Sequence, residues 1–135
     1  MLKLIKLILN SRFLLAFAIA STLAISYLSL SDISSLPKLE VQFEDKLYHI
    51  VAYYSLNSVW LLAITALKSK HSKYDVLISL GIISFGIVIE LFQEILTDYR
   101  TFDNYDILAN SLGVIISFLV FLSLKKRILE NINMN

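Results

Sequence analysis

Four long apolar runs constrain this 135-residue chain more than any other feature of its sequence. They cover residues 13–30, 47–67, 76–96 and 107–124. A helix needs about 20 apolar residues to cross the hydrocarbon core of a bilayer, within a range of about 17–25. The chain is 57% hydrophobic, more than the roughly 45–50% of soluble domains. The sequence therefore predicts one all-α domain over residues 1–135, an integral membrane four-helix bundle.

The first apolar run has an alternative interpretation. Lys3 and Lys6, followed by an apolar stretch and the small residues of "AIAS", are similar to a cleavable signal peptide. The run continues to Leu30, however, and is longer than the apolar core of about 7–15 residues that a signal peptide has. We therefore expect this run to be kept as a membrane-spanning helix.

Basic residues flank the four runs unevenly. Three of them, Lys38, Lys46 and Arg100, lie in the first and third connections. The other nine lie before the first run, in the second connection or after the fourth run: Lys3, Lys6, Arg12, Lys68, Lys70, Lys73, Lys125, Lys126 and Arg127. Cytoplasmic flanks of membrane helices are enriched in Lys and Arg. We therefore expect both termini to be cytoplasmic and the first and third connections to face outward.

Small residues at four-residue spacing predict close contacts between helices. The first run has Ala16, Ala20 and Ala24 at this spacing, and the fourth has Gly113 and Ser117. We interpret both sets as packing residues.

Polar residues recur in the last three runs, toward the ends that face outward in this topology. They are Asp45, His49, Tyr53 and Asn57, then Glu90 and Gln93, then Asp106, Asn110, Gly113 and Ser117. Spacings of three and four residues keep side chains on one face of a helix, so three polar faces should meet at one depth. The third connection places Arg100 and Asp103 above them. Because a charge near the bilayer centre costs at least about 2.5–3.5 kcal/mol, we interpret the group as a functional site.

A purely structural role is the main alternative for these residues. Glu90 would then form a polar clasp with His49, Lys46 or Arg100 that fixes the packing of the helices. Such interhelical contacts are common and contribute about 0.6 kcal/mol each. Packing alone does not require so many ionisable residues at one depth, which favours a site.

The same residues resemble the signature of the VanZ-like family of small bacterial membrane proteins. "DKLYH" resembles its D-K-x-x-H pattern, on Asp45, Lys46 and His49. The E-x-x-Q, R and D-x-x-x-N-x-x-G patterns fall on Glu90, Gln93, Arg100, Asp106, Asn110 and Gly113. The chain departs from the family at Ser117, where many members have a second glycine, and at "TDYR", which replaces a proline-containing approach to the arginine. The resemblance implies a multi-pass protein of the bacterial cytoplasmic membrane, in a family whose namesake is associated with teicoplanin resistance.

Two functions of different classes fit these residues. In the first, the protein is not an enzyme and binds or shields an anionic lipid-linked cell-wall component, or contributes to resistance to a glycopeptide. Lys46 and Arg100 would hold phosphates or carboxylates, and the other binding residues would be Asp45, Gln93, Asp103 and Asn110. In the second, it is a membrane enzyme acting on a phospho- or acyl-lipid at the outer leaflet. Its catalytic residues would be His49, Glu90 and Asp106.

Other classes of function fit less well. Asp45, His49, Glu90 and Asp106 do not have the spacing of a known metal-ligand signature, so we expect neither a metal nor another cofactor. A net charge of +1 does not suggest a nucleic-acid partner. Transport would require a homo-oligomer, which the sequence leaves open, and the polar residues thin out toward the cytoplasmic half. The expected partners are membrane lipids, a lipid-linked cell-wall precursor or a glycopeptide.

Overall fold

The computed structural model describes residues 11–31, 43–67, 72–99 and 101–133, which form four helices. They are α2 (Ser11–Leu30), α3 (Glu44–Ala66), α4 (Ser72–Leu96) and α5 (Asn104–Asn133). Each is long and apolar enough to cross a membrane, which confirms the all-α prediction of four such helices. The helices extend beyond the apolar runs, most of all α5, which continues nine residues past the predicted end at 124. Polar residues can continue a helix, and after Gly113 the sequence has no glycine or proline to end it.

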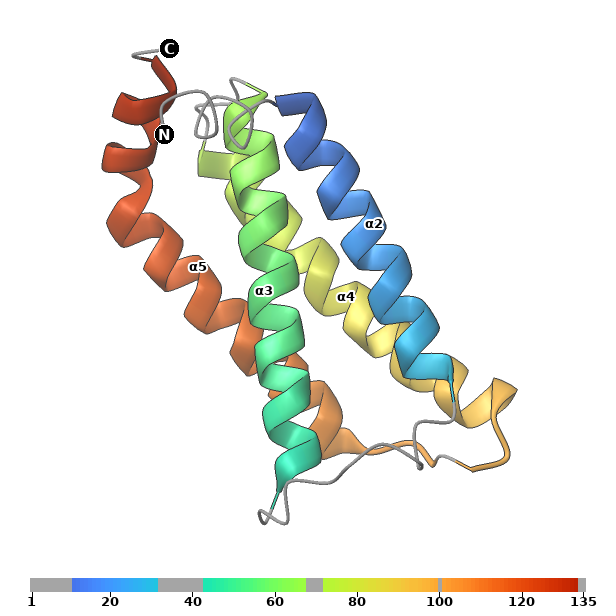
Figure 1. Cartoon of the computed structure of the whole chain (residues 1–135). Helices are drawn as coiled ribbons and strands as arrows, with labels where there is room; N and C mark the ends of the chain where they lie inside the picture. Colours follow the sequence, from blue (N-terminus) through green and yellow to red (C-terminus); the bar gives the residue numbers. More distant parts are fainter. Residues whose placement is uncertain (1–10, 32–42, 68–71, 100, 134–135) are drawn as a thin grey trace.

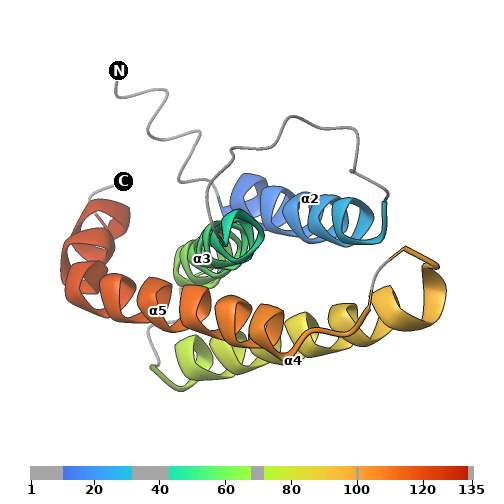
Figure 2. The same cartoon turned by 90° about the horizontal axis from the view of Figure 1, so that it is seen from below.

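The four helices lie side by side and alternate in direction along the chain (Figure 1). At one end α2 and α4 end and α3 and α5 begin; we call this the polar end. At the other, which we call the terminal end, α2 begins and α5 ends. Seen along the bundle, α3 lies between α2 on one side and α4 with α5 on the other (Figure 2). The central α3 and its neighbour α5 therefore run in the same direction.

The closest helix contact joins α3 and α5 at Gly113. A Cβ atom at this position would lie 2.3 Å from the backbone oxygen of Ile50, so only glycine fits without a shift of the helices. Ser117, one turn further along α5, is 1% exposed. Both residues of the fourth run that we predicted for packing are thus at the interface.

The prediction that Ala16, Ala20 and Ala24 pack against a neighbouring helix is wrong. Ala16, Ala20 and Ala24 are exposed, whereas Leu14 and Ala18 are buried. These two pack against the α3 residues Ala63 and Ala66. Four-residue spacing identifies a face of a helix but does not tell which face meets a neighbour.

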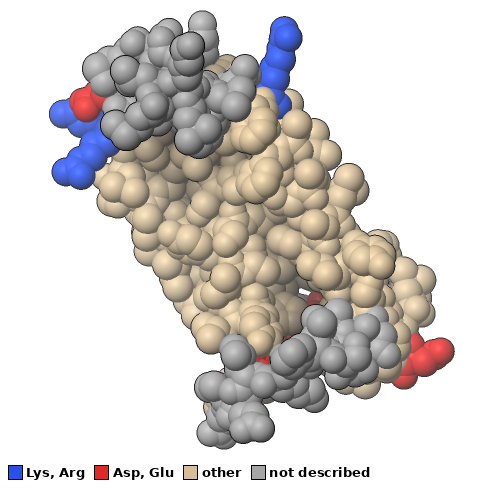
Figure 3. Space-filling view, viewed as in Figure 1, with Lys and Arg blue, Asp and Glu red and all other residues tan. Residues whose placement is uncertain are grey.

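The distribution of polar residues on α4 is the reverse of that in a soluble bundle. Its buried residues include Asp75, Ser79, Gly86, Glu90 and Gln93, at spacings of three, four or seven. Its exposed residues are mostly apolar, as for a helix that faces lipid. On the face shown in Figure 3, the described charged side chains lie toward the two ends and the middle is uncharged.

Candidate functional site

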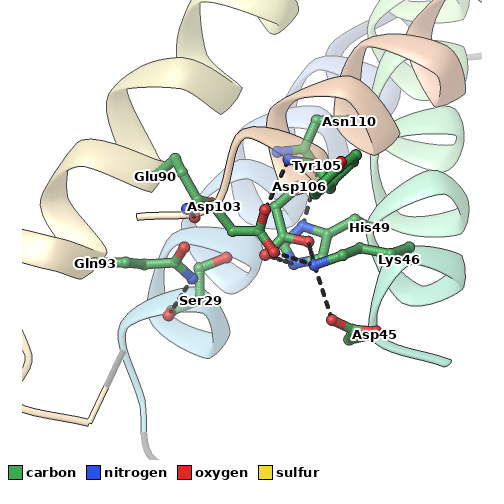
Figure 4. A network of polar contacts seen from close by, with 10 residues as sticks. All are labelled: Ser29, Asp45, Lys46, His49, Glu90, Gln93, Asp103, Tyr105, Asp106 and Asn110. Atoms are coloured by element: carbon green, nitrogen blue, oxygen red, sulfur yellow. Dashed lines mark hydrogen bonds and ion pairs between the residues drawn. The ribbon is translucent and has the colours of Figure 1, made fainter. Parts of the chain in front are cut away.

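The predicted site residues that the structure describes gather at the polar end (Figure 4). They come from the start of α3, the end of α4 and the start of α5: Asp45, Lys46, His49, Glu90, Gln93, Asp103, Asp106 and Asn110. Asp103 immediately precedes α5. Arg100, the predicted anion-holding residue, lies outside the described residues.

The Lys46 ammonium group is surrounded by three carboxylates. Its Nζ lies 2.5 Å from Asp103 Oδ2, 2.6 Å from Asp106 Oδ1 and 2.9 Å from Asp45 Oδ2. An ammonium group has three hydrogen-bond donors, and three acceptors are already present. Lys46 thus joins α3 to α5 and has no donor left for an anionic ligand in this arrangement.

Asp103 connects this cluster to α4 and to the first turn of α5. Its Oδ1 accepts a hydrogen bond from the Tyr105 backbone N–H at 2.8 Å, as a residue capping a helix N-terminus does. Its own backbone N–H donates to Glu90 Oε1 at 3.0 Å. The hydrogen bond from Lys46, followed by that from Tyr105, holds the pKa of Asp103 below its ordinary value of 3.8.

Both ring nitrogens of His49 face groups on α5. Nδ1 lies 2.9 Å from Asn110 Oδ1 and, because an amide oxygen only accepts, Nδ1 carries the hydrogen in this arrangement. Nε2 lies 3.6 Å from Asp106 Oδ2. Asn110 therefore fixes the orientation of the imidazole, and the Nε2 nitrogen faces the Asp106 carboxylate beyond hydrogen-bond distance.

Glu90 is the most deeply buried ionisable residue of the polar end, with 1% of its surface exposed. Its Oε1 accepts the Asp103 N–H, but Oε2 has no hydrogen-bond partner among the described residues. The Tyr53 hydroxyl is buried and equally without a partner there. The Tyr53 ring lies against Gly86, one turn before Glu90 on α4: a Cβ at Gly86 would be 2.9 Å from Tyr53 Cε1. The Tyr53 ring therefore lies about one helical turn from Glu90 along α4.

Gln93 is buried but does not join the cluster around Lys46. Its Nε2 donates to the backbone oxygen of Ser29 at 2.8 Å and so ties α4 to the end of α2. Tyr99 reinforces this connection, because its hydroxyl donates to the Leu30 oxygen at 2.6 Å. The structure therefore gives Gln93 a packing contact, and its binding role stays a prediction.

A second buried ionic group lies near the terminal end and was missed in the sequence. Asp75 of α4 is 0% exposed and forms an ion pair with Lys125 of α5. The second carboxylate oxygen of Asp75 and the hydroxyl of Ser79 are buried without partners among the described residues. Asp75 could have been found from its spacing to Ser79, Gly86 and Glu90, which places it on the same face of α4 as Glu90.

A third polar contact lies midway between the two ends. Asn57 Nδ2 donates to the Val114 backbone oxygen at 3.3 Å and to Ser117 Oγ at 3.2 Å. Ser58 Oγ lies 2.9 Å from the same Ser117 oxygen. Ser117, where the chain departs from the VanZ-like pattern, thus contributes its hydroxyl to a contact between α3 and α5.

Metal binding has no geometric support within the described ranges. No group of three His, Cys, Asp or Glu side chains among those residues is arranged to hold a metal ion. Three aspartates at the polar end, Asp45, Asp103 and Asp106, are instead bridged by Lys46.

Comparison with known proteins gives one informative match. No family model matches the chain, and no solved structure matches it. A protein of the yeast Schizosaccharomyces pombe, described as "Uncharacterized protein C11E3.10", is 33% identical over 98 residues. The match covers 73% of this chain but only 59% of the yeast protein. The relationship to VanZ-like proteins and the bacterial location stay predictions.

Proposed function

We propose that this chain is a VanZ-like multi-pass membrane protein whose polar end faces outward from a bacterial cytoplasmic membrane. There it binds or shields the head group of an anionic lipid-linked cell-wall component. If that component is the target of a glycopeptide, the same binding would contribute to resistance.

The buried carboxylate of Glu90 carries this proposal. Burying an ionisable group in a membrane protein is costly, and such groups mark functional sites. A buried carboxylate that serves only as a packing clasp should pair with a cation, as Asp75 does with Lys125. Glu90 leaves Oε2 without a partner among the described residues, so a ligand or water has a reason to occupy this place.

Arg100 holds the anionic group of the ligand in this proposal. The Lys46 ammonium is already engaged by three carboxylates, and a planar guanidinium is suited to bidentate contact with phosphate or carboxylate. Catalysis through His49 is the second candidate, because Asn110 orients the ring through Nδ1 and leaves Nε2 without a hydrogen bond among the described residues. We favour binding because the buried Glu90 Oε2 has no partner there.

The outward orientation can be tested by labelling, because the chain contains no cysteine. Thr101→Cys, at the polar end, should react with a membrane-impermeant maleimide in intact cells. Ser72→Cys, at the start of α4, should react only after the cells are permeabilised. Labelling of Ser72→Cys alone in intact cells would contradict an outward-facing site.

Binding can be tested by native mass spectrometry of the gently purified protein. We expect a co-purifying lipid that is lost in Glu90→Gln. Glu94→Gln is the matched control, because Glu94 is exposed on the same helix one turn away. A protein without any bound lipid, or equal retention in both variants, would contradict the proposal.

A further inference from the structure

The charges of the described residues at the polar end do not balance. Three carboxylates, those of Asp45, Asp103 and Asp106, share the Lys46 ammonium, and Asp106 also faces His49 (Figure 4). A fourth carboxylate, that of Glu90, bonds only to a backbone N–H among the described residues. Hydrogen-bond acceptors are thus in excess, and the buried one without a partner is Glu90 Oε2.

The Tyr53 hydroxyl is a second buried polar group without a partner among the described residues. Tyr53 is 2% exposed and Glu90 is 1% exposed, so neither polar group reaches bulk solvent. The Tyr53 ring, from α3, lies against Gly86, one turn before Glu90 on α4. The two oxygens are not hydrogen-bonded to each other, and both can accept a hydrogen bond from a cationic donor.

We propose that Glu90 and Tyr53 bind the primary ammonium group of a zwitterionic lipid head, of the phosphoethanolamine type. The proposal rests on the proposed function, that a lipid head enters the polar end, and assigns its cationic part. The ammonium donates hydrogen bonds to Glu90 Oε2 and to the Tyr53 oxygen, and it offsets part of the acidic surplus. Lys46 makes the same type of ammonium–carboxylate contact with the neighbouring aspartates.

The packing of α2 against its neighbours differs between the two ends of the bundle. Near the terminal end, α2 packs on α3 through Ala18 and through Thr22, whose hydroxyl accepts a hydrogen bond from Trp60 at 3.0 Å. At the polar end α2 is tied instead to α4, through Gln93 and Tyr99. The two helices α2 and α3 therefore diverge toward the polar end (Figure 1).

Figure 3 shows acidic atoms in a small gap of the surface toward the polar end. A lipid whose head group enters there would keep its acyl chains in the membrane, which is why we assign a lipid head rather than a soluble amine.

Head-group methylation provides the test, because it removes the N–H donors and keeps the charge. The delipidated full-length protein would be titrated with phosphatidylethanolamine, phosphatidylcholine and phosphatidylglycerol of identical acyl chains and observed by native mass spectrometry. Wild type should bind phosphatidylethanolamine at least about tenfold more tightly than phosphatidylcholine, as expected for charge-assisted hydrogen bonds. Glu90→Gln should reduce this ratio to near one, and Tyr53→Phe should reduce it in part. Glu94→Gln should keep the ratio.

The outcomes separate this inference from the proposed function. Equal binding of the ethanolamine and choline lipids by wild type would overturn the ammonium subsite, as would a preference that survives in Glu90→Gln. Tighter binding of phosphatidylglycerol would overturn it too, but would leave an outward lipid site intact. Binding of none of the three lipids would overturn the ammonium subsite, while the proposed function would still be decided by the lipid that co-purifies with the protein. If Glu90→Gln does not fold, the ratio measured with Tyr53→Phe decides, with an unchanged ratio counting against the subsite.

Discussion

The two ends of α4 bury ionic groups of different composition. Near the terminal end Asp75 pairs with Lys125, its one cationic partner among the described residues. At the polar end one ammonium is shared by three aspartates, and Glu90 pairs with no cation among the described residues. A buried ion pair is sufficient to fix two helices in register. A buried carboxylate without a cation has no such structural use, which is why we place the ligand at the polar end, next to Glu90.

Of the substitutions considered, we expect the largest loss of stability at the terminal end, where Asp75 and Lys125 form a buried ion pair. Lys125→Met removes the cation that neutralises a carboxylate with no solvent exposure. Breaking a buried ion pair on one side typically costs about 3–5 kcal/mol. We expect a loss of this size in the free energy of unfolding, measured by denaturant titration in detergent micelles.

Two further variants show whether the loss arises from the pair itself. The exposed neighbour Lys126 gives the matched control, Lys126→Met, which should change the free energy of unfolding by no more than about 0.5 kcal/mol. The double variant Asp75→Leu with Lys125→Met should recover most of the stability, because it leaves no unpaired charge. A double variant as unstable as Lys125→Met alone would show that the pair is not a simple clasp.

We expect the second largest loss of stability from a substitution at Gly113, where α3 and α5 are in contact. Gly113→Ala places a methyl group against the Ile50 backbone and forces α3 and α5 apart. Overpacking of this kind costs about 1–3 kcal/mol, and the separation should also weaken lipid binding at the polar end.

Gly81 offers a control for the helix propensity of alanine. A Cβ at Gly81 meets nothing within 4 Å, so Gly81→Ala should leave stability unchanged or raise it by up to about 1 kcal/mol. Equal effects of the two glycine substitutions on thermal unfolding would argue against a tight contact between α3 and α5.

Local patterns explain which features could be predicted from the sequence. The length of each apolar run gives a membrane-spanning helix, and spacings of three and four residues place Glu90, His49 and Asn110 on inward faces. Partner choice depends on the rotation and register of separate helices, which no local pattern specifies. The sequence therefore predicted Lys46 as an anion-binding residue, whereas the register of α3 against α5 surrounds it with carboxylates. Asp75 was missed because the predicted third span began at residue 76, while α4 begins at Ser72.

The contact midway along the bundle should contribute less than either end. Ser117→Ala removes the hydroxyl that lies between Asn57 and Ser58. Interhelical hydrogen bonds in membrane proteins average about 0.6 kcal/mol, and we expect a loss of about that size. Ser84→Ala is the control, because Ser84 is exposed and bonds only within its own helix. A loss above about 2 kcal/mol for Ser117→Ala would give the middle of the bundle a role comparable to that of its ends.

The smallest expected effect is a change in acid sensitivity at the polar end. Because the folded-state pKa of Asp103 lies below its ordinary value of 3.8, its contribution to stability is present above that value and is lost as pH falls through the folded pKa. The Asp103 side chain is 35% exposed, so the contribution should not exceed about 1 kcal/mol. Thermal unfolding of wild type and Asp103→Asn should therefore differ slightly at neutral pH and converge in acid. Asp98→Asn, at an exposed position beyond the end of α4, should follow the wild-type curve throughout. If Asp103→Asn also follows the wild-type curve at neutral pH, the contact between Lys46 and Asp103 adds nothing to stability, and two aspartates rather than three would hold the ammonium.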